Sequence, residues 1–336
     1  MLSSFECGQY CLRYETCQSF NYKSAITYED DQINCQLSKL NDMKQNIKGN
    51  DGEWIYYKAL HVSQFEGVNE SVCEHGGKFI HGSCHCDIKY EGKRCERERV
   101  FKSCAEVSYF GSGAKDGSYK IKTETPSNYT RVYCQMTSLV GCGGSGWTMV
   151  MKISGLKKTF EYNSRLWKNN ESFNIQAGQT GFDFEETKLP TFWSTSSREI
   201  CVGMKVGNDL RSLSFSYQAN SLYTLFADDI YRSTNITREK WKSLITGSSL
   251  QTGCRKQGFN VDTLQFIDVR FGYVGNEQEH CNSTDSYIGF GSSFDHGQYW
   301  CSLPNTNASN IAGNLASCYP DNGNVNIAAM AYILVR

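Results

Sequence analysis

The pattern of apolar and polar residues predicts one short helix and several strands. Near the start, FECGQYCLRYETC places Cys7 and Cys11 four residues apart, the spacing of one helix face. The runs SFNYKS, INCQLSKL and the aromatic GEWIYYKAL are typical of strands. At the other end, AMAYILVR has the continuous apolar character of a buried terminal strand. The polar stretches HVSQFEGVNES and ERERVFKS contain no cysteine and predict linkers.

The sixteen cysteines fall into groups of four, four and eight, separated by these linkers. Oxidising compartments use cysteines as disulfide staples, and each even-numbered group can close its own bridges. In the first group we expect a nested pairing, Cys7–Cys35 around Cys11–Cys17, that ties the helix to the strands. Six N-x-S/T sequons are an independent sign of a secretory route. The sequons lie at Asn69, Asn128, Asn170, Asn235, Asn282 and Asn307.

The charge balance narrows the range of partners. The chain has 34 basic and 35 acidic side chains, a net of −1, which argues against a nucleic-acid partner or a polybasic membrane contact. No stretch approaches the roughly 20 apolar residues of a membrane span, so we expect no transmembrane segment. The opening MLSSFECGQYCLRY lacks the basic and apolar regions of a signal peptide. Because the cysteines predict secretion, we expect the precursor to begin upstream of Met1.

The first cysteine group resembles the PAN/apple family over about residues 1–60. The resemblance rests on the helix cysteines, CQSFNY at Cys17–Tyr22, CQL at Cys35–Leu37 and the closing WIYY. The strand that normally precedes the PAN helix is absent, which also indicates a start upstream of Met1. The resemblance implies a module that binds proteins or carbohydrates and has no catalytic residue.

Residues 70–97 resemble the second half of an EGF-like module. The segment CEHGGKFIHGSCHCDIKYEGKRC lacks the first and third of the six family cysteines, and Phe79 stands where the third would fall. The resemblance implies the pairs Cys73–Cys84 and Cys86–Cys95. It implies no EGF-type calcium site, because no Asp-x-Asp/Asn-Glu motif precedes the first of these cysteines. A segment of about 25 residues cannot bury enough core to fold without such staples.

Zinc binding is the alternative for this segment. His81, Cys84, His85 and Cys86 are close in sequence and suit zinc chemically. A Cys-x-Cys pair with an adjacent His would crowd the ligands, and the Gly-Gly and Tyr-x-Gly positions would be unexplained. We therefore favour disulfides here.

Residues 98–336 resemble fibrinogen C-terminal-like and intelectin-like domains at their N-terminal end. The shared elements are Cys104-Ala-Glu, Asp116-Gly117-Ser118-Tyr119, Val132-Tyr133-Cys134-Gln135-Met136, Gly143-Gly144 and Gly146-Trp147-Thr148. The resemblance implies a Cys104–Cys134 bridge. Beyond residue 155 the chain looks like a divergent branch found in secreted proteins of simple animals, several of them skeletal organic-matrix proteins of corals. Sequence alone does not pair the six other cysteines, which are Cys142, Cys201, Cys254, Cys281, Cys301 and Cys318.

No nucleophile–base set indicates catalysis. Ser145 lies among glycines, but Trp147 occupies the last position of what would be G-x-S-x-G. The adjacent carboxylates Glu185–Glu186 and Asp228–Asp229 would face opposite ways on a strand, so we interpret them as solvated surface residues. We expect the protein not to be an enzyme.

The late segment GNEQEHCNSTDSYIGFGSSFDHGQYWC is the candidate binding loop. Oxygen-rich loops bind calcium, and aromatic faces stack on sugar rings. Intelectin-like lectins combine calcium, histidine and acidic ligands with flanking aromatics in this region. The alternative is a polar loop pinned by a disulfide. The candidate calcium ligands are Asn276, Glu277, Glu279, His280 and Asp285, and the candidate sugar-stacking aromatics are Tyr299 and Trp300.

These observations predict an α+β, multi-domain, disulfide-rich protein. Its expected modules are PAN/apple-like at 1–60, EGF-like with four cysteines at 70–97, and fibrinogen C-terminal-like, or intelectin-like, at 98–336. The expected function is a secreted extracellular-matrix or adhesion protein that binds extracellular proteins or glycans, such as a skeletal organic-matrix component in biomineralization. A calcium-dependent soluble lectin is the alternative.

Overall fold

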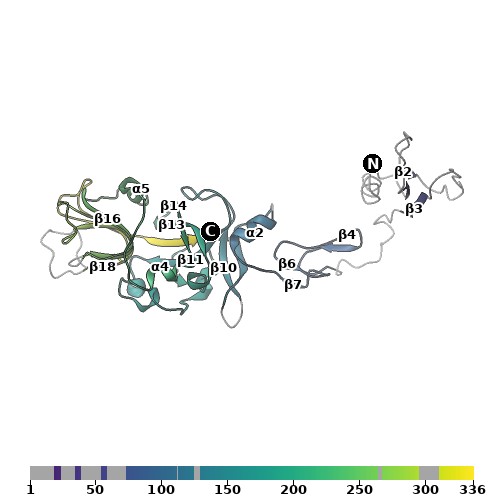
Figure 1. Cartoon of the computed structure of the whole chain (residues 1–336), viewed down its shortest axis with the longest axis horizontal. Helices are drawn as coiled ribbons and strands as arrows, with labels where there is room; N and C mark the ends of the chain where they lie inside the picture. The colour runs from purple at the N-terminus through teal and green to yellow at the C-terminus, as the bar shows by residue number, and fades with distance from the viewer. Residues whose placement is uncertain are drawn as a thin grey trace. The chain divides into compact units, whose positions relative to one another are not determined.

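The computed structural model describes residues 73–111, 113–124, 129–263, 267–294 and 310–336, together with the backbone of three strands in the first 72 residues. The chain divides into two compact units, Met1–Arg97 and Glu98–Arg336 (Figure 1). Helices are present, but strands in several sheets carry the architecture. The protein is therefore mostly β and disulfide-rich. Among the described residues, no helix is long and apolar enough to cross a membrane.

The first unit begins with a three-stranded antiparallel sheet in the order β2-β1-β3. The strands are β1 (Ser19–Lys23), β2 (Cys35–Ser38) and β3 (Trp54–Lys58), and each falls within one of the expected strand runs. The central β1 pairs Phe20 with Leu37 on one side and with Tyr57 on the other. The expected helix and the expected bridges Cys7–Cys35 and Cys11–Cys17 lie outside the described residues.

The second part of the first unit is a small module held by two disulfides. Cys73 is bonded to Cys84 and Cys86 to Cys95, the pairs that the EGF-like resemblance implies. The hairpin of β4 (Lys78–Ile80) and β5 (Ser83–His85) and the short pair β6 (Tyr90–Glu91) and β7 (Arg97–Glu98) provide its backbone pairing. Cysteines in disulfides cannot act as thiolate zinc ligands.

The second unit contains two antiparallel-rich sheets (Figure 1). The larger has eight strands in the order β14-β13-β21-β11-β10-β9-β8, with β12 beside β11. Its strands are β8 (Val100–Phe101), β9 (Gly117–Lys122), β10 (Tyr129–Gln135), β11 (Trp147–Ser154), β12 (Thr187–Lys188), β13 (Ser197–Val206), β14 (Asp209–Ala219) and β21 (Met330–Val335).

The smaller sheet of the second unit has six strands in consecutive order, β15 to β20. They are β15 (Arg232–Ser233), β16 (Gly253–Val261), β17 (Ile267–Asn276), β18 (Ser286–Phe294), β19 (Ala312–Ala316) and β20 (Val325–Ala328). The described helices are short: α2 (Cys104–Phe110), α3 (Thr191–Ser194), α4 (Tyr223–Phe226), α5 (Arg238–Lys242) and the 3-10 turns η3 (Lys158–Phe160), η4 (Arg165–Trp167) and η5 (Ile175–Gln179).

The last strand, β21, lies in the middle of the larger sheet. It pairs with β11 on one side and with β13 on the other, and all six of its residues are buried. The helices α2 and α3 and the turn η5 contact β11, so this part of the sheet is covered. A strand buried on both faces is a continuous apolar run, as the sequence of β21 shows.

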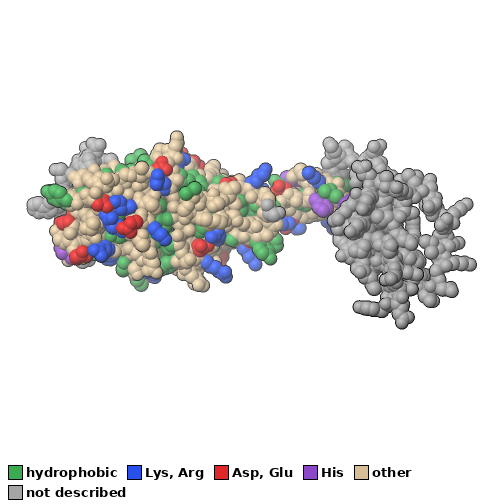
Figure 2. Space-filling view, turned by 90° about the horizontal axis from the view of Figure 1, so that it is seen from above, with side chains coloured by type: hydrophobic (Ala, Val, Ile, Leu, Met, Phe, Trp, Pro, Cys, Tyr) green, Lys and Arg blue, Asp and Glu red, His purple; other side chains and the backbone are tan. Residues whose placement is uncertain are grey.

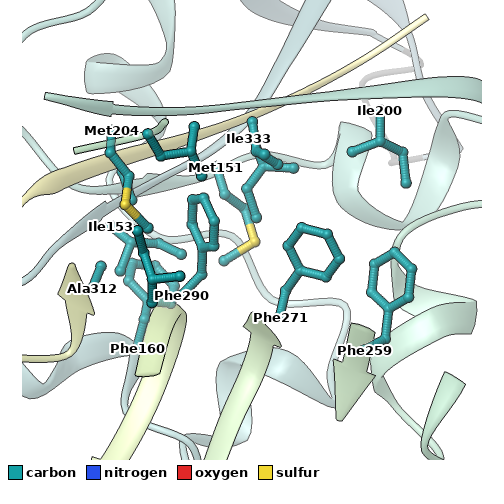
Figure 3. Packing of buried hydrophobic residues seen from close by; sticks show 14 of the residues in the cluster. Met151, Ile153, Phe160, Ile200, Met204, Phe259, Phe271, Phe290, Ala312 and Ile333 are labelled. Atoms are coloured by element: carbon teal, nitrogen blue, oxygen red, sulfur yellow. The ribbon is translucent and has the colours of Figure 1, made fainter. Parts of the chain in front are cut away.

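An aromatic-rich core joins the two sheets. Phe271 of β17 lies 4.5 Å from the ring of Phe259, 4.9 Å from Trp241 and 5.5 Å from Phe215 of the larger sheet, measured between ring centroids. Figure 3 shows phenylalanines of the smaller sheet pointing toward Met151 and other apolar side chains of the larger sheet. Burial of this contact surface holds the two sheets together.

Three further disulfides close the second unit. Cys104 of α2 is bonded to Cys134 of β10, as the fibrinogen-like resemblance implies. The sequence left the other pairs open, and the structure joins Cys142 to Cys201 and Cys254 to Cys281. Cys318 is disulfide-bonded as well. Cys301 lies outside the described residues.

Two of the adjacent carboxylates have structural roles. The interpretation of Glu186 as a surface residue is wrong, because it is 2% exposed and accepts hydrogen bonds from the Ser154 amide at 3.0 Å and the Thr159 hydroxyl at 2.7 Å. Asp229 pairs at 2.7 Å with Arg270, whose side chain is fully buried. A buried charge requires such partners, since its desolvation is costly.

The exposed charges agree with the balanced composition. On the face that Figure 2 displays, basic and acidic side chains of the described residues are interspersed. Most ion pairs among the described residues involve partly exposed side chains, such as Arg165–Glu171 at 3.3 Å. Exposed pairs of that kind contribute little to folding stability. We therefore attribute most of the stability of the second unit to the core between its two sheets.

We predict that Phe271→Ala destabilises the second unit by about 3–5 kcal/mol, because it removes the ring at the centre of the aromatic core. Chemical denaturation with intact disulfides, followed by tryptophan fluorescence, measures the change. Leu156→Ala is the matched control, since Leu156 is 68% exposed and its truncation should change stability by less than about 0.5 kcal/mol. Equal losses in both variants would contradict this account of the core.

Candidate functional site

The candidate binding loop connects two strands of the smaller sheet. β17 ends at Asn276 and β18 begins at Ser286, so residues 277–285 form the connection. Cys281 in this loop is bonded to Cys254 of the neighbouring β16. The bridge lies where the β16–β17 register shifts. The bridge therefore ties the loop covalently to the neighbouring strand of its own sheet.

Asn276 closes the base of the loop. Its side chain is fully buried, and its amide group donates to the carbonyl oxygen of His280 at 2.9 Å and to the hydroxyl of Ser283 at 3.4 Å. Its side-chain oxygen accepts from the amide of Glu277 at 3.0 Å. These bonds occupy the side chain, so Asn276 shapes the loop and its oxygen is already engaged.

Glu277 and Asp285 form the polar centre of the loop. Their carboxyl groups are hydrogen-bonded to each other. The amide group of Gln251, which is almost fully buried, donates to Glu277 at 3.0 Å and to the carbonyl oxygen of Cys318 at 2.8 Å. The structure thus brings together two of the five expected calcium ligands and adds an amide from a distant part of the chain.

The pKa values of the two carboxyl groups are shifted in opposite directions. Burial, and then the neighbouring Glu277 carboxylate, raise the pKa of Asp285 to about 7. Burial alone would raise the pKa of Glu277, but hydrogen bonds from Asp285, its own backbone amide and Gln278 and Gln251 lower it below its usual value. Two carboxyl groups this close cannot both ionise easily, so below about pH 7 Glu277 is charged and Asp285 holds the proton.

The remaining expected ligands lie apart from this pair. Glu279 is exposed and forms an ion pair with Arg255 at 3.5 Å. The side chain of His280 is exposed, while its carbonyl oxygen serves Asn276. Tyr299 and Trp300 lie outside the described residues. The sequence analysis grouped residues of one loop, of which the structure brings Glu277 and Asp285 together and separates Glu279 and His280 from them.

The metal-binding capacity of this loop is limited. Among the described residues, no three or more His, Cys, Asp and Glu side chains are grouped to hold a metal ion. Calcium takes about 6–8 oxygen ligands, so a cation at Glu277 and Asp285 would need backbone carbonyls or water for the rest. The carboxyl pair supplies charge for a divalent cation and only part of its coordination.

Gln251 was not expected at this site from the sequence. This residue precedes β16 and lies 26 positions before Glu277, and nothing in its neighbourhood, SSLQTGC, indicates a site. Only the pairing of β16 with β17 brings it to the loop. Three of the six sequon asparagines, Asn170, Asn235 and Asn282, are exposed, whereas the other three lie outside the described residues.

We predict that Asp285→Asn changes how stability depends on pH. The pKa of Asp285 is higher in the folded chain than the ordinary value near 3.9, so its favourable contribution is complete below about pH 4 and is lost as the pH rises to about 7. Asparagine keeps a donor to Glu277 and cannot ionise. The unfolding free energy of the variant should therefore rise relative to wild type between pH 5 and pH 8.

Denaturation curves at both pH values measure this difference. Glu279→Gln is the matched control, because this exposed acid lies in the same loop and should shift stability equally at both pH values. A pH-independent difference between Asp285→Asn and wild type would show that the two carboxyl groups do not share a proton.

Comparison with known proteins identifies one part of the chain. The PAN domain family matches residues 1–61, the segment that contains β1, β2 and β3. No curated protein matches the chain. Many disulfides together with a PAN domain are typical of extracellular proteins. Residues 1–61 are therefore a PAN domain, followed by a small two-disulfide module and a large unit of two sheets.

Proposed function

We propose that this chain is a secreted extracellular-matrix or adhesion protein that binds extracellular proteins or glycans and has no catalytic activity. The observation that carries the proposal is the arrangement of the five described disulfides beside a PAN domain. In each bridge both cysteines lie in the small module or both lie in the second unit, so each part is cross-linked internally. Independent, separately stapled modules are typical of proteins that present several binding surfaces outside the cell.

We also propose a family for the small module and for the second unit. We assign residues 70–97 to an EGF-like module that has four cysteines instead of six. The hairpin β4–β5 and the pairs Cys73–Cys84 and Cys86–Cys95 support this assignment. We assign residues 98–336 to a fibrinogen C-terminal-like domain. Its support is the bridge between α2 and β10 and the burial of Trp147 at the start of β11.

The chemistry of the small module favours an oxidising location. Its strands are two or three residues long and none of their residues is buried, so it has little apolar core. Two bridges in so short a segment restrict the unfolded chain, which is how domains of this size gain about 2–4 kcal/mol per bridge. In a reducing compartment this support would be lost, and the module would unfold.

Retention of the purified full chain on deposited extracellular matrix tests this proposal. The chain is expressed through a secretory pathway and incubated with cell-free matrix, and bound protein is measured over a range of concentrations. We expect saturable retention, because modules of this type present specific surfaces. The reduced and alkylated chain is the control, and it should bind without saturation or not at all.

The same preparation provides an independent check of secretion chemistry. The intact mass should show cysteines paired and should show glycans at exposed sequons such as Asn170, Asn235 and Asn282. Matrix binding that is absent or unsaturable would overturn the proposed function, and free thiols throughout the chain would overturn its extracellular setting.

A calcium-dependent soluble lectin is the second candidate, and one observation favours it. The carboxyl groups of Glu277 and Asp285 share a proton that a divalent cation could replace, and the loop that holds them is pinned by the Cys254–Cys281 bridge. A cation there would present coordination positions to sugar hydroxyls.

A glycan array with calcium or with a chelator tests the lectin function. We expect glycan signals that vanish in the chelator and in the double variant Glu277→Gln/Asp285→Asn. Glu279→Gln should retain them, because its carboxylate pairs with Arg255 away from the site. Absence of any glycan signal in calcium would eliminate this candidate.

A further inference from the structure

The strand β14 forms a long edge of the larger sheet. It has 11 residues and lies at the end of the strand order, next to β13. The strands at the other ends of the two described sheets of the second unit, β8, β15 and β20, have only 2, 2 and 4 residues. An edge strand presents backbone donors and acceptors to other chains, and proteins limit this risk with short or covered edges. A cover therefore matters most at β14.

The two ends of β14 carry features that discourage pairing, whereas its middle does not. Asp209 and Arg211 form an exposed ion pair at 2.9 Å at the start of the strand. Near the other end, the register against β13 shifts between Ser216 and Ala219. Charged residues and bulges both hinder the addition of a further strand. The segment SLSFSYQA, residues 212–219, has no charge and no proline, a composition that favours pairing with a copy of itself.

A short loop covers the middle of β14. Residues 139–142, which we call the strap, lie along the strand. The carbonyl oxygen of Gly141 accepts a hydrogen bond from the backbone amide of Ser214 at 3.0 Å, and the carbonyl oxygen of Val140 accepts one from the hydroxyl of Ser212. Alternate amides of an edge strand point away from the sheet, so the Ser214 amide is one that an added strand would use. The strap occupies that position instead.

The strap lies too close to β14 to carry a side chain at Gly141. Its backbone has a φ of +87°, and a first side-chain carbon would lie 1.7 Å from the carbonyl oxygen of Ser212. Glycine adopts positive φ without steric cost and lets two backbones approach closely. The glycine therefore allows direct contact between the strap and the edge.

A buried disulfide anchors the strap. Cys142 is bonded to Cys201 of β13, and both side chains are fully buried. Cys201 is directly opposite Ser214 in the β13–β14 pair, so the anchor is level with the contact between strap and edge. The next opposed pair, Val202 and Leu213, belongs to the core. Because successive side chains of a strand point to opposite faces, the bridge lies on the face turned away from the core.

We propose that the strap keeps the middle of β14 from pairing with β14 of a second copy of this chain. Two such strands related by a twofold axis pair antiparallel, and each presents the same uncharged segment to the other. Displacement of the strap opens this surface, and the chain then self-associates edge to edge. The proposal goes beyond the proposed function, because it holds whether or not the chain is retained on matrix.

Sedimentation velocity of the whole chain, with its disulfides intact and over a range of concentrations, tests the proposal. Gly141→Ala displaces the strap, because the added carbon clashes with the backbone of β14. We expect its apparent dissociation constant for self-association to be at least about tenfold lower than that of the wild type. Gly207→Ala is the matched control. Gly207 also has a positive φ, +58°, but a side chain there meets nothing within 4 Å, so this variant should behave like the wild type.

Added charges show whether β14 is the interface. Ser216→Lys in the Gly141→Ala chain places a charge at an exposed position of the edge strand and should reverse the association, because like charges then face each other across the pair. Ser83→Lys in the same chain adds the same charge to an exposed position of the small module and should not reverse it. Hydrogen exchange should also be slower in residues 212–218 of the associated chain than in the monomer.

Several outcomes would overturn the proposal. They are a Gly141→Ala chain as monomeric as the wild type, equal association of Gly207→Ala, and reversal by Ser83→Lys as complete as by Ser216→Lys.

A milder variant decides the case in which Gly141→Ala fails to fold. Ser212→Ala/Ser214→Ala removes only the two hydroxyl bonds to the strap. Self-association about two- to tenfold tighter than in the wild type would support the proposal, and unchanged association would contradict it.

Discussion

The second unit depends on the insertion of β21 between β11 and β13. Without this strand the larger sheet would be two separate pieces, because β13 and β14 reach the rest of the sheet only through it. The same strand supplies Ile333 to the core that faces the smaller sheet. It also places Arg336 beside Glu199 and Trp147. One central strand thus joins the two parts of the larger sheet and contributes to the core.

Local patterns in the sequence predicted a few elements of this architecture but not their partners. The apolar run AMAYILVR indicated a buried strand, and β21 is fully buried. Its position in the sheet could not be predicted, since the segments that flank it lie more than a hundred residues earlier in the chain. The pairing of Cys142 with Cys201 was open for the same reason. Spacing within a module is local information, whereas strand order is set by packing of the whole unit.

In the candidate sites, too, local sequence information indicates some residues but not the residues that fold against them. Glu277 and Asp285 were found because acidic residues gather in one loop, yet Gln251, which binds Glu277, comes from another element. Glu186 was misread because adjacent carboxylates are usually solvated, whereas β12 and the turn around Thr159 enclose this one. A cavity of the second unit that Lys102, Lys122 and Arg198 line has no sequence signal, because its lining comes from five separate segments. Side chains that meet only after folding leave no motif in the sequence.

The two bridges of the small module have a mechanical consequence. They close loops in which the bonded cysteines are 11 and 9 positions apart, and they follow one another without overlap. Under tension between its two ends, this segment cannot lengthen through those loops while the bridges are intact. Reduction of both would release roughly 57 Å of additional contour length, at about 3.4 Å per extended residue and after subtraction of the 5.7 and 5.4 Å that the bonded Cα atoms already span. For a chain anchored at both ends, the redox state of these cysteines would set how far it can stretch before a packed unit must unfold.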